Sequence, residues 1–137
     1  MTPARPIPQP DEVTQPYWDA AKRGELVMQR CGSCQRWIFQ PKLACPSCHS
    51  DELVWEPVSG NGTIYSFVKV HPPVLPAFKE KTPYLVVLVE LAEDPGLRVL
   101  GNLLDHDTSA ARIGHPVAVV YESLDDGVVL PQWQLTD

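Results

Sequence analysis

The first regular pattern along the chain is a short run of apolar residues at helical spacing. The segment TQPYWDAAKRG (residues 14–24) begins with Thr14, a residue type that caps helix N-termini, and ends with Gly24, which favours helix C-termini. Tyr17 and Trp18 lie between them on the apolar face. This pattern predicts a helix of roughly ten residues. Because so short a helix is marginal alone in water, its aromatic side chains must pack on the chain's own domain or on a partner subunit.

From residue 60 onward, short apolar stretches separated by turn residues predict β-strands. Five segments have this character: GNGTIYSFVKVH (60–71), YLVVLVELA (84–92), LRVLGNLLD (97–105), IGHPVAVVYESL (113–124) and GVVLPQWQL (127–135). The second is apolar on both faces and therefore central in its sheet, and a broken alternation in the first predicts a β-bulge near Ser66. Five short strands predict a small closed barrel, either an OB-fold or an SH3-like barrel, and the strand count alone does not separate the two.

Three details of the connections carry further expectations. Asp125, Asp126 and Gly127 predict a tight hairpin turn between the last two strands. Gly101 predicts a bend or a close approach inside the third strand. The segment HPPVLPAFKEKTP (71–83) is a loop with four prolines, and a loop of this length in a small domain is usually functional or mobile.

All four cysteines lie within 18 residues and form two C-x-x-C pairs, Cys31 with Cys34 and Cys45 with Cys48. Two such turns bring four thiolates to one tetrahedral metal, which suits Zn²⁺ with Zn–S bonds of about 2.3 Å. The spacing therefore predicts a zinc ribbon with each pair at the tip of a short hairpin. Four cysteines close the coordination shell, so the site is structural and does not need His49 as a further ligand. Iron in a rubredoxin-like site is the alternative metal, because sulfur-only sites accept either ion.

Other uses of the thiols fit the sequence less well. The N-terminus has no basic-then-apolar signal, so a cytoplasmic location with reduced thiols is expected, against two disulfides. Thioredoxin-like redox chemistry usually uses one C-x-x-C beside a βαβ pattern, and that pattern is not visible. No apolar run reaches the roughly 18 residues of a membrane span.

The charge balance weighs against nucleic-acid binding. The chain has 11 Lys and Arg against 17 Asp and Glu, a net charge of −6, and its basic residues are scattered. A surface that follows phosphates needs clustered basic residues. Tyr65 and Phe67 are two positions apart and are expected on one strand face, where aromatics could stack on bases. A nucleic-acid-binding zinc-ribbon and OB module therefore stays as the alternative function.

The ordered set of motifs resembles a bacterial and archaeal family of thiolase-associated proteins, long labelled a domain of unknown function. It consists of PYWDAAKRGELVMQRCGSC, CPSC, GNGTIYSFVKVH, TPYLVVLVELA, RIGHPVAVVY and LPQW. The resemblance covers residues 16–134 and implies a mainly β chain in three parts. These are a leader and N-terminal helix (1–25), a rubredoxin-like zinc ribbon (26–57) and a five-stranded OB-fold barrel (58–137).

The resemblance also implies a function. Such proteins form hetero-oligomers with thiolase-like proteins, including a steroid side-chain retro-aldolase, and work with MaoC-like hydratases on acyl-CoA substrates. We therefore expect a non-catalytic accessory subunit that stabilises such an enzyme and helps to form its acyl-CoA channel. The aromatic helix, residues 71–83 and the late LPQWQL segment are expected to contact the partner.

Direct acyl-CoA contact would need basic groups on or near the barrel strands and loops, because CoA carries phosphates. The candidates are Lys69, His71, Lys79, Lys81 and Arg98. Catalytic residues are not expected, because the histidines have no nucleophile near them in the sequence and the serines lie in no nucleophile-elbow motif.

Overall fold

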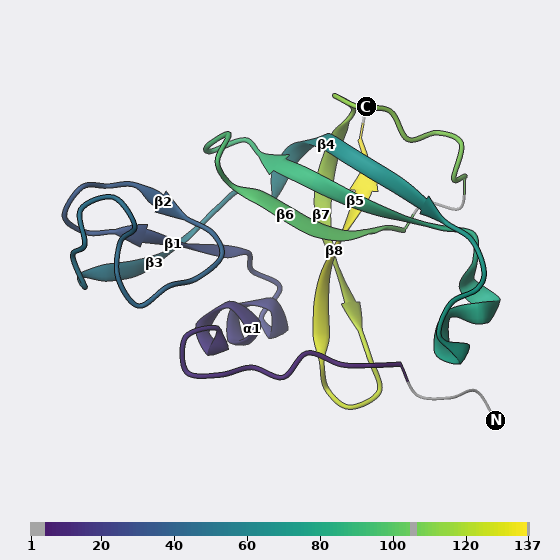
Figure 1. Cartoon of the computed structure of the whole chain (residues 1–137), viewed down its shortest axis with the longest axis horizontal. Helices are drawn as coiled ribbons and strands as arrows, with labels where there is room; N and C mark the ends of the chain where they lie inside the picture. The colour runs from purple at the N-terminus through teal and green to yellow at the C-terminus, as the bar shows by residue number, and fades with distance from the viewer. Residues whose placement is uncertain (1–4, 105–106, 137) are drawn as a thin grey trace.

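The structure, a computed structural model, describes residues 5–104 and 107–136. A zinc-ribbon sheet lies at one end and a β-barrel at the other, with one helix beneath them (Figure 1). The elements in chain order are α1 (Gln15–Lys22), β1 (Val27–Cys31), β2 (Trp37–Ile38), β3 (Leu53–Pro57), β4 (Asn61–Val70), the 3₁₀ helix η1 (Pro76–Lys81), β5 (Tyr84–Leu91), β6 (Arg98–Leu103), β7 (Pro116–Ser123) and β8 (Val129–Leu135). No helix among the described residues is long and apolar enough to cross a membrane.

Helix α1 is eight residues long, two fewer than the sequence pattern indicates. Thr14 is its N-cap by position, but its side chain makes no capping bond to the helix. The Asp11 carboxylate organises this entry instead, because its Oδ1 accepts the N–H groups of Val13 (3.0 Å) and Thr14 (2.9 Å). Hydrogen bonding from Thr14 holds the pKa of Asp11 below its ordinary value. Gly24 follows the helix with φ +74°, the left-handed conformation that ends helices.

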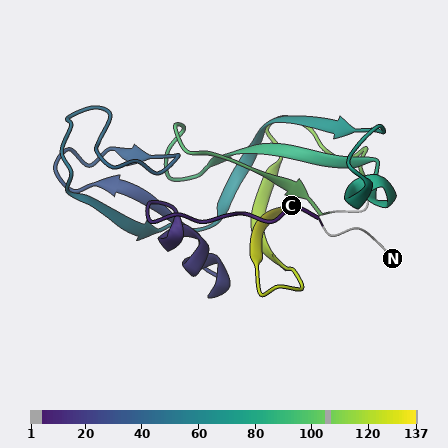
Figure 2. The ribbon, with the colours of Figure 1, turned by 60° about the horizontal axis from the view of Figure 1, so that its bottom comes forward.

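The aromatic side chains of α1 pack on the chain's own domain. The helix contacts β1 and β8 and lies against both modules (Figures 1 and 2). Tyr17 packs against the main core, and the Trp18 ring meets it edge-on with 5.1 Å between centroids. Tyr17 also contacts Phe39 of the ribbon, with 6.3 Å between ring centroids. The helix therefore joins ribbon and barrel, and packing on the chain's own domain is confirmed for Tyr17.

The ribbon is a three-stranded antiparallel sheet with the order β2–β1–β3. β1 and β2 form the expected hairpin around the first cysteine pair. The second pair does not lie at the tip of its own hairpin, because β3 pairs with β1 from Val27↔Pro57 to Cys31↔Leu53. The expectation of two separate hairpins is wrong, since β1 pairs with both β2 and β3.

The barrel closes in the order β4–β5–β6–β8–β7, and β4 pairs with β7. β6 and β8 are parallel at Leu103↔Trp133, and this order is that of an OB-fold. The bulge is confirmed between Ile64 and Ser66, and residues 125–127 make the expected hairpin turn. The long proline-rich loop is not irregular throughout, because it contains η1. The end of the third predicted strand, Asp105, lies outside the described residues.

The barrel core is built by alternate residues of its strands and by one tryptophan. In β5 the buried side chains alternate with half-buried ones, so only one face is fully buried although the strand pairs on both sides. Trp133 of β8 is completely buried, and a Cβ at Gly101 would lie 2.8 Å from its Cδ1. The close approach expected at Gly101 is therefore confirmed. The prediction that the LPQWQL segment contacts a partner is wrong for residues 131–133, which are buried inside the barrel.

Candidate metal centre and barrel cavity

The four cysteines meet at the end of the ribbon. Their Sγ atoms all lie within 4.8 Å of one another. The Sγ atoms of Cys31 and Cys48 are 3.5 Å apart, and those of Cys34 and Cys45 are 3.6 Å apart. These separations fit four thiolates on one tetrahedral metal with Zn–S bonds of about 2.3 Å. The donor set is sulfur alone and complete, so a metal held here would have a structural role.

The two C-x-x-C turns have the same backbone geometry. Gln35 donates its N–H to the Cys31 carbonyl (3.0 Å), and His49 does the same to the Cys45 carbonyl (2.9 Å). Both residues have positive φ, +68° for Gln35 and +64° for His49. His49 therefore closes a turn through its backbone, and the cluster of potential metal ligands in the described chain consists of the four cysteines without it.

Backbone N–H groups favour the thiolate forms. Ser33 and Cys34 each donate an N–H to Cys31 Sγ at 3.4 Å, and Ser47 donates to Cys45 Sγ at 3.4 Å. The N–H groups of Cys48 and Ser47 lower the pKa of Cys45 to about 6, and those of Cys34 and Ser33 lower the pKa of Cys31. Metal binds thiolate and not thiol, so the backbone prepares Cys31 and Cys45 for a cation. At Cys34 the Arg36 N–H is outweighed by burial and by the neighbouring thiols, which raise the pKa of Cys34 to about 11.

Side chains outside the cysteine motifs also hold the ribbon. The buried Gln29 amide pairs with the backbone of Lys42, donating to its carbonyl (2.9 Å) and accepting its N–H (2.8 Å). Ser33 and Ser50 connect the two turns through their hydroxyls at 2.9 Å. Sequence reasoning missed these contacts, because a lone polar residue in a short strand or turn has no recognisable pairing pattern.

The basic residues proposed for acyl-CoA contact are not all brought together. Lys69 and His71 lie at the end of β4, and Lys79 and Lys81 lie on η1, so these four share one end of the barrel. Arg98 pairs with Glu90 of β5. Glu90 is six residues from Tyr84, the β5 residue at the barrel end with the lysines, so at 3.4 Å per residue Arg98 lies about 20 Å from that end. The guanidinium of Arg98 lies 4.0 Å from the ring centroid of Tyr65.

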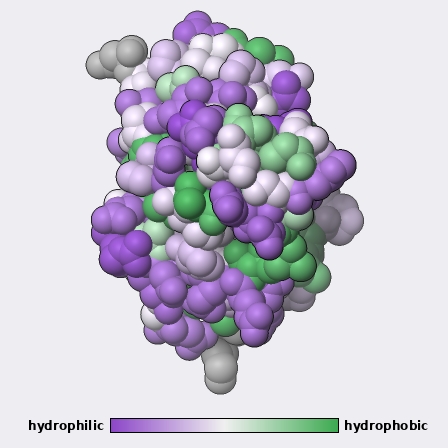
Figure 3. Space-filling model, turned by 90° about the vertical axis from the view of Figure 1, so that its left-hand side faces the viewer, coloured by the Kyte–Doolittle hydropathy of each residue, from purple (hydrophilic) through white to green (hydrophobic). Residues whose placement is uncertain are grey.

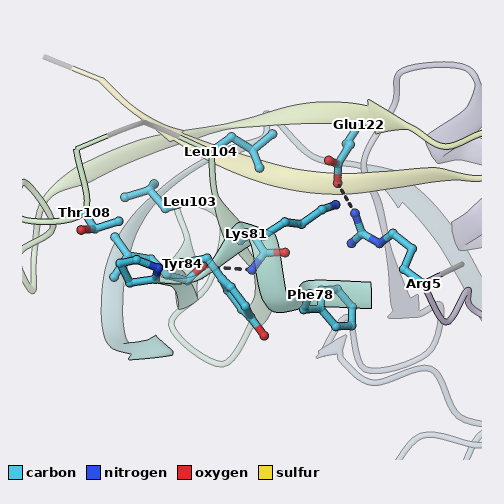
Figure 4. Close-up of a pocket in the computed structure, with 11 residues that line it drawn as sticks. Arg5, Phe78, Lys81, Tyr84, Leu103, Leu104, Thr108 and Glu122 are labelled. Atoms are coloured by element: carbon cyan, nitrogen blue, oxygen red, sulfur yellow. Dashed lines mark hydrogen bonds and ion pairs between the residues drawn. The ribbon is translucent and has the colours of Figure 1, made fainter. Parts of the chain in front are cut away.

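Of these five basic residues, Lys81 lines a cavity of about 380 Å³ (Figure 4). The cavity lies between η1, β5, β6 and the N-terminal segment. Its polar wall is a network in which Gln132 donates to Glu122 (3.0 Å) and to Asn102 (3.2 Å). Arg5 reaches Glu122 at 3.5 Å from the N-terminal side. Most of the remaining lining is leucine, proline and aromatic side chains, so the cavity can hold a ligand with both polar and apolar parts.

The aromatic pair expected on one strand face is split by the bulge. Phe67 pairs with the inward-facing Val87 and packs against the core, whereas Tyr65 stays exposed beneath Arg98. The expected shared face is wrong, because Tyr65 is itself the extra, unpaired residue of the bulge, between Ile64 paired with Val89 and Ser66 paired with Leu88. The outer face of β5 and β6 carries exposed aliphatic residues such as Leu100.

Two family models match consecutive parts of the chain. The model described as "ChsH2, rubredoxin-like zinc ribbon domain" matches residues 18–54. The model described as "ChsH2, C-terminal OB-fold domain" matches residues 55–122. Together they cover the second half of α1, the metal site and most of the barrel.

Three relatives are 30–36% identical to this chain over the aligned residues. A "DUF35 domain-containing scaffold protein" of Methanothermobacter thermautotrophicus is 30% identical over 86% of this chain and 90% of its own length. A "Probable enoyl-CoA hydratase alpha subunit" of Thermomonospora curvata is 36% identical over 93% of this chain, which spans 39% of that protein. A "3-oxo-4,17-pregnadiene-20-carboxyl-CoA hydratase alpha subunit" of Mycobacterium tuberculosis is 34% identical over 87% of this chain, which spans 35% of it.

A solved structure titled "Ltp2-ChsH2(DUF35) aldolase" contains a chain with the same fold. The TM-score is 0.86 and the identity 33%, over 94% of this chain and 98% of that chain.

Proposed function

This chain belongs to the DUF35 family, with the zinc-ribbon and OB-fold domains of ChsH2, and from this premise we propose that it is a non-catalytic accessory subunit of an acyl-CoA enzyme. The observation that carries the proposal is its match, over 98% of that chain, to a chain of the Ltp2–ChsH2 aldolase structure. The complete sulfur ligand set supports a structural metal, which suits a subunit that stabilises and positions an enzyme.

The partner we propose is a thiolase-like aldolase, with a MaoC-like hydratase as the second choice. The aldolase match spans nearly the whole of the matched chain, whereas this chain spans 39% and 35% of the two hydratase alpha subunits. The steroid acyl-CoA in the name of one relative supports a bulky acyl-CoA as the substrate class. We expect the complex to work in the cytoplasm.

For acyl-CoA contact we propose the barrel end that carries η1. Lys69, His71, Lys79 and Lys81 gather there, and the cavity beneath η1 has the mixed lining that an acyl-CoA arm requires. Docked beside the partner's active site, this end would line part of the acyl-CoA channel. Arg98 lies too far along the barrel to belong to the same contact unless the ligand is extended.

Zinc is the metal we propose for the four cysteines. The zinc-ribbon family model and the clustered thiols support it, and nothing in the structure favours iron over zinc. Metal analysis of protein purified from cells grown with both metals should give one equivalent of zinc. Stoichiometric iron, with the visible absorption of an iron–thiolate site, would instead establish the rubredoxin-like alternative.

Co-purification tests the subunit assignment. The tagged chain is expressed together with a thiolase-like protein of the same organism, and the mass of the eluted species is measured by light scattering. A complex of defined ratio is expected, with acyl-CoA cleavage activity that neither protein shows alone. If the chain elutes as a monomer and binds single-stranded oligonucleotide in a salt-dependent manner, the nucleic-acid alternative replaces this proposal.

A further inference from the structure

A groove of about 660 Å³ separates the zinc ribbon from the turn between β5 and β6. The ribbon wall carries basic and aromatic side chains, and the turn wall carries acidic ones. The residues that matter are Arg30, Arg36, Trp37 and Lys42 on the ribbon, with Glu93 and Asp94 on the turn. Arg30 also pairs with Glu56 of β3 at 3.2 Å. Among the described residues, the positive charges of the ribbon wall without a carboxylate partner are therefore those of Arg36 and Lys42, and they lie across the groove from two carboxylates.

The cationic wall is held in place before any partner binds. Arg30 lies over the Trp37 ring at 4.5 Å from its centroid and donates Nε–H to the Gln35 carbonyl at 2.9 Å. Arg36 donates to the Ser47 hydroxyl of the second cysteine turn. Each guanidinium has five N–H donors, so both keep donors for another acceptor. Fixed side chains lose little conformational entropy on binding, which makes these arginines good anchors.

The acidic wall is fixed in the same way. Glu93 accepts the Ser59 N–H at 2.7 Å, and Asp94 accepts the Gly96 N–H at 2.7 Å. In each case one carboxylate oxygen is used, and the described residues supply no hydrogen bond to the other. The groove thus presents two held arginines on the ribbon wall and two held carboxylates on the turn wall.

This arrangement fits a protein segment better than a phosphate-rich or apolar ligand. A polyphosphate would meet carboxylates on the turn wall, and an apolar ligand would leave the charges unpaired. The ribbon end in Figure 3 shows hydrophobic patches (green) interspersed with hydrophilic residues (purple), a pattern typical of interfaces between separately folded proteins. Tryptophan and arginine are also the residue types that most often anchor such interfaces.

We propose that this groove docks the partner enzyme subunit through a segment that places acidic side chains against the ribbon wall and a basic side chain against the turn wall. The inference rests on the proposed function, because it presupposes a partner subunit. It differs from the surfaces expected from the sequence, since residues 131–133 are buried and the aromatic residues of α1 pack within the chain.

Charge reversal in the co-purified complex tests the groove. Lys42→Glu is the first variant, because among the described residues its ammonium group makes no hydrogen bond or ion pair, so reversal should leave the fold intact. Arg36→Glu is the second. Lys22→Glu on α1, an exposed lysine away from the groove, is the matched control for the change in net charge. All three must keep the wild-type metal content and unfolding midpoint.

The dissociation constant is measured at about 0.15 M salt. Lys42→Glu and Arg36→Glu should each raise it at least about tenfold, because an attraction becomes a repulsion at a desolvated surface, and Lys22→Glu should change it less than about threefold. Zero-length carbodiimide cross-linking of the wild-type complex should join the Lys42 amine to a carboxylate of the partner.

Two results would overturn the inference. In the first, the complex forms and both groove variants bind like the wild type, whether or not Leu100→Ser on the exposed face of β6 abolishes binding. The partner then docks elsewhere on the chain, and the subunit assignment stands. If no complex forms with any thiolase-like or hydratase partner, both the groove and the subunit assignment fail.

Discussion

Removing the metal should unfold the tip of the ribbon while the barrel stays folded. The ribbon's own buried cluster consists of Cys31, Ile38 and Cys45, with Leu53 packed against it. Two of the three buried members are metal ligands, so little apolar burial remains when the metal leaves. The barrel core, in contrast, has thirteen buried residues and no metal ligand.

The magnitudes favour local and not global unfolding. The buried Ile38 side chain contributes roughly 1.5–3 kcal/mol, and the partly buried Leu53 contributes less. A four-ligand zinc site contributes about 10–16 kcal/mol of apparent binding free energy at neutral pH. The metal is therefore the larger contribution to order in residues 31–52. The base of the ribbon should persist, because Leu26 and Met28 belong to the barrel core.

Hydrogen exchange before and after chelation measures this directly. The amides of Gln35 and His49, which close the two cysteine turns, should lose protection, whereas those of Val87 and Val89 in β5 should keep it. Added zinc should restore the protection. Simultaneous loss throughout the barrel would refute the reasoning by showing that ribbon and barrel unfold as one unit. Full protection in metal-free protein would show that packing alone holds the ribbon.

Three further perturbations follow from individual contacts. Gly101→Ala should lower the unfolding free energy by about 1–3 kcal/mol in urea titration, because the new Cβ would lie 2.8 Å from Trp133; an unchanged midpoint would mean that the barrel relaxes freely. Asp11→Asn should lower the unfolding free energy near neutral pH, because the pKa of Asp11 is lowered in the folded protein and its carboxylate stabilises the fold only when ionised. The difference in unfolding free energy from wild type should vanish as the pH falls from the ordinary pKa of 3.8 through the lowered one, and a pH-independent difference would refute this. Lys81→Ala should weaken acyl-CoA binding by the assembled complex about tenfold, measured by calorimetry with Lys22→Ala as control, and equal affinities would remove Lys81 from the proposed contact.

Local patterns predicted most of the elements. The broken alternation near Ser66 appears as a bulge, the residues at 125–127 form a turn, and the cysteine spacing brings four thiols together. Each of these signals depends on residues close in sequence, where backbone preference or ligand geometry decides the outcome. The 3₁₀ helix η1 was missed because so short a helix has no hydrophobic period within a proline-rich loop.

Long-range contacts account for the errors. The sequence predicts that Trp133, in the LPQWQL segment, contacts a partner. The parallel pairing of β6 with β8 instead places its side chain inside the barrel beside Gly101. The pairing of β3 with β1 cannot be read from either strand alone. The contact between Arg5 and Glu122 joins residues far apart in the sequence, so the cavity they line was not predictable either.

The metal and the proposed docking groove are linked through the cysteine turns. Arg30 is held by the Gln35 carbonyl in the first turn, and Arg36 by the Ser47 hydroxyl in the second. If metal loss unfolds these turns, the cationic wall loses its geometry although none of its charges changes. We therefore expect chelation to weaken partner binding at least as much as Lys42→Glu does, while barrel amides stay protected. Binding that survives chelation with an unfolded ribbon would separate the metal from docking and place the partner on the barrel.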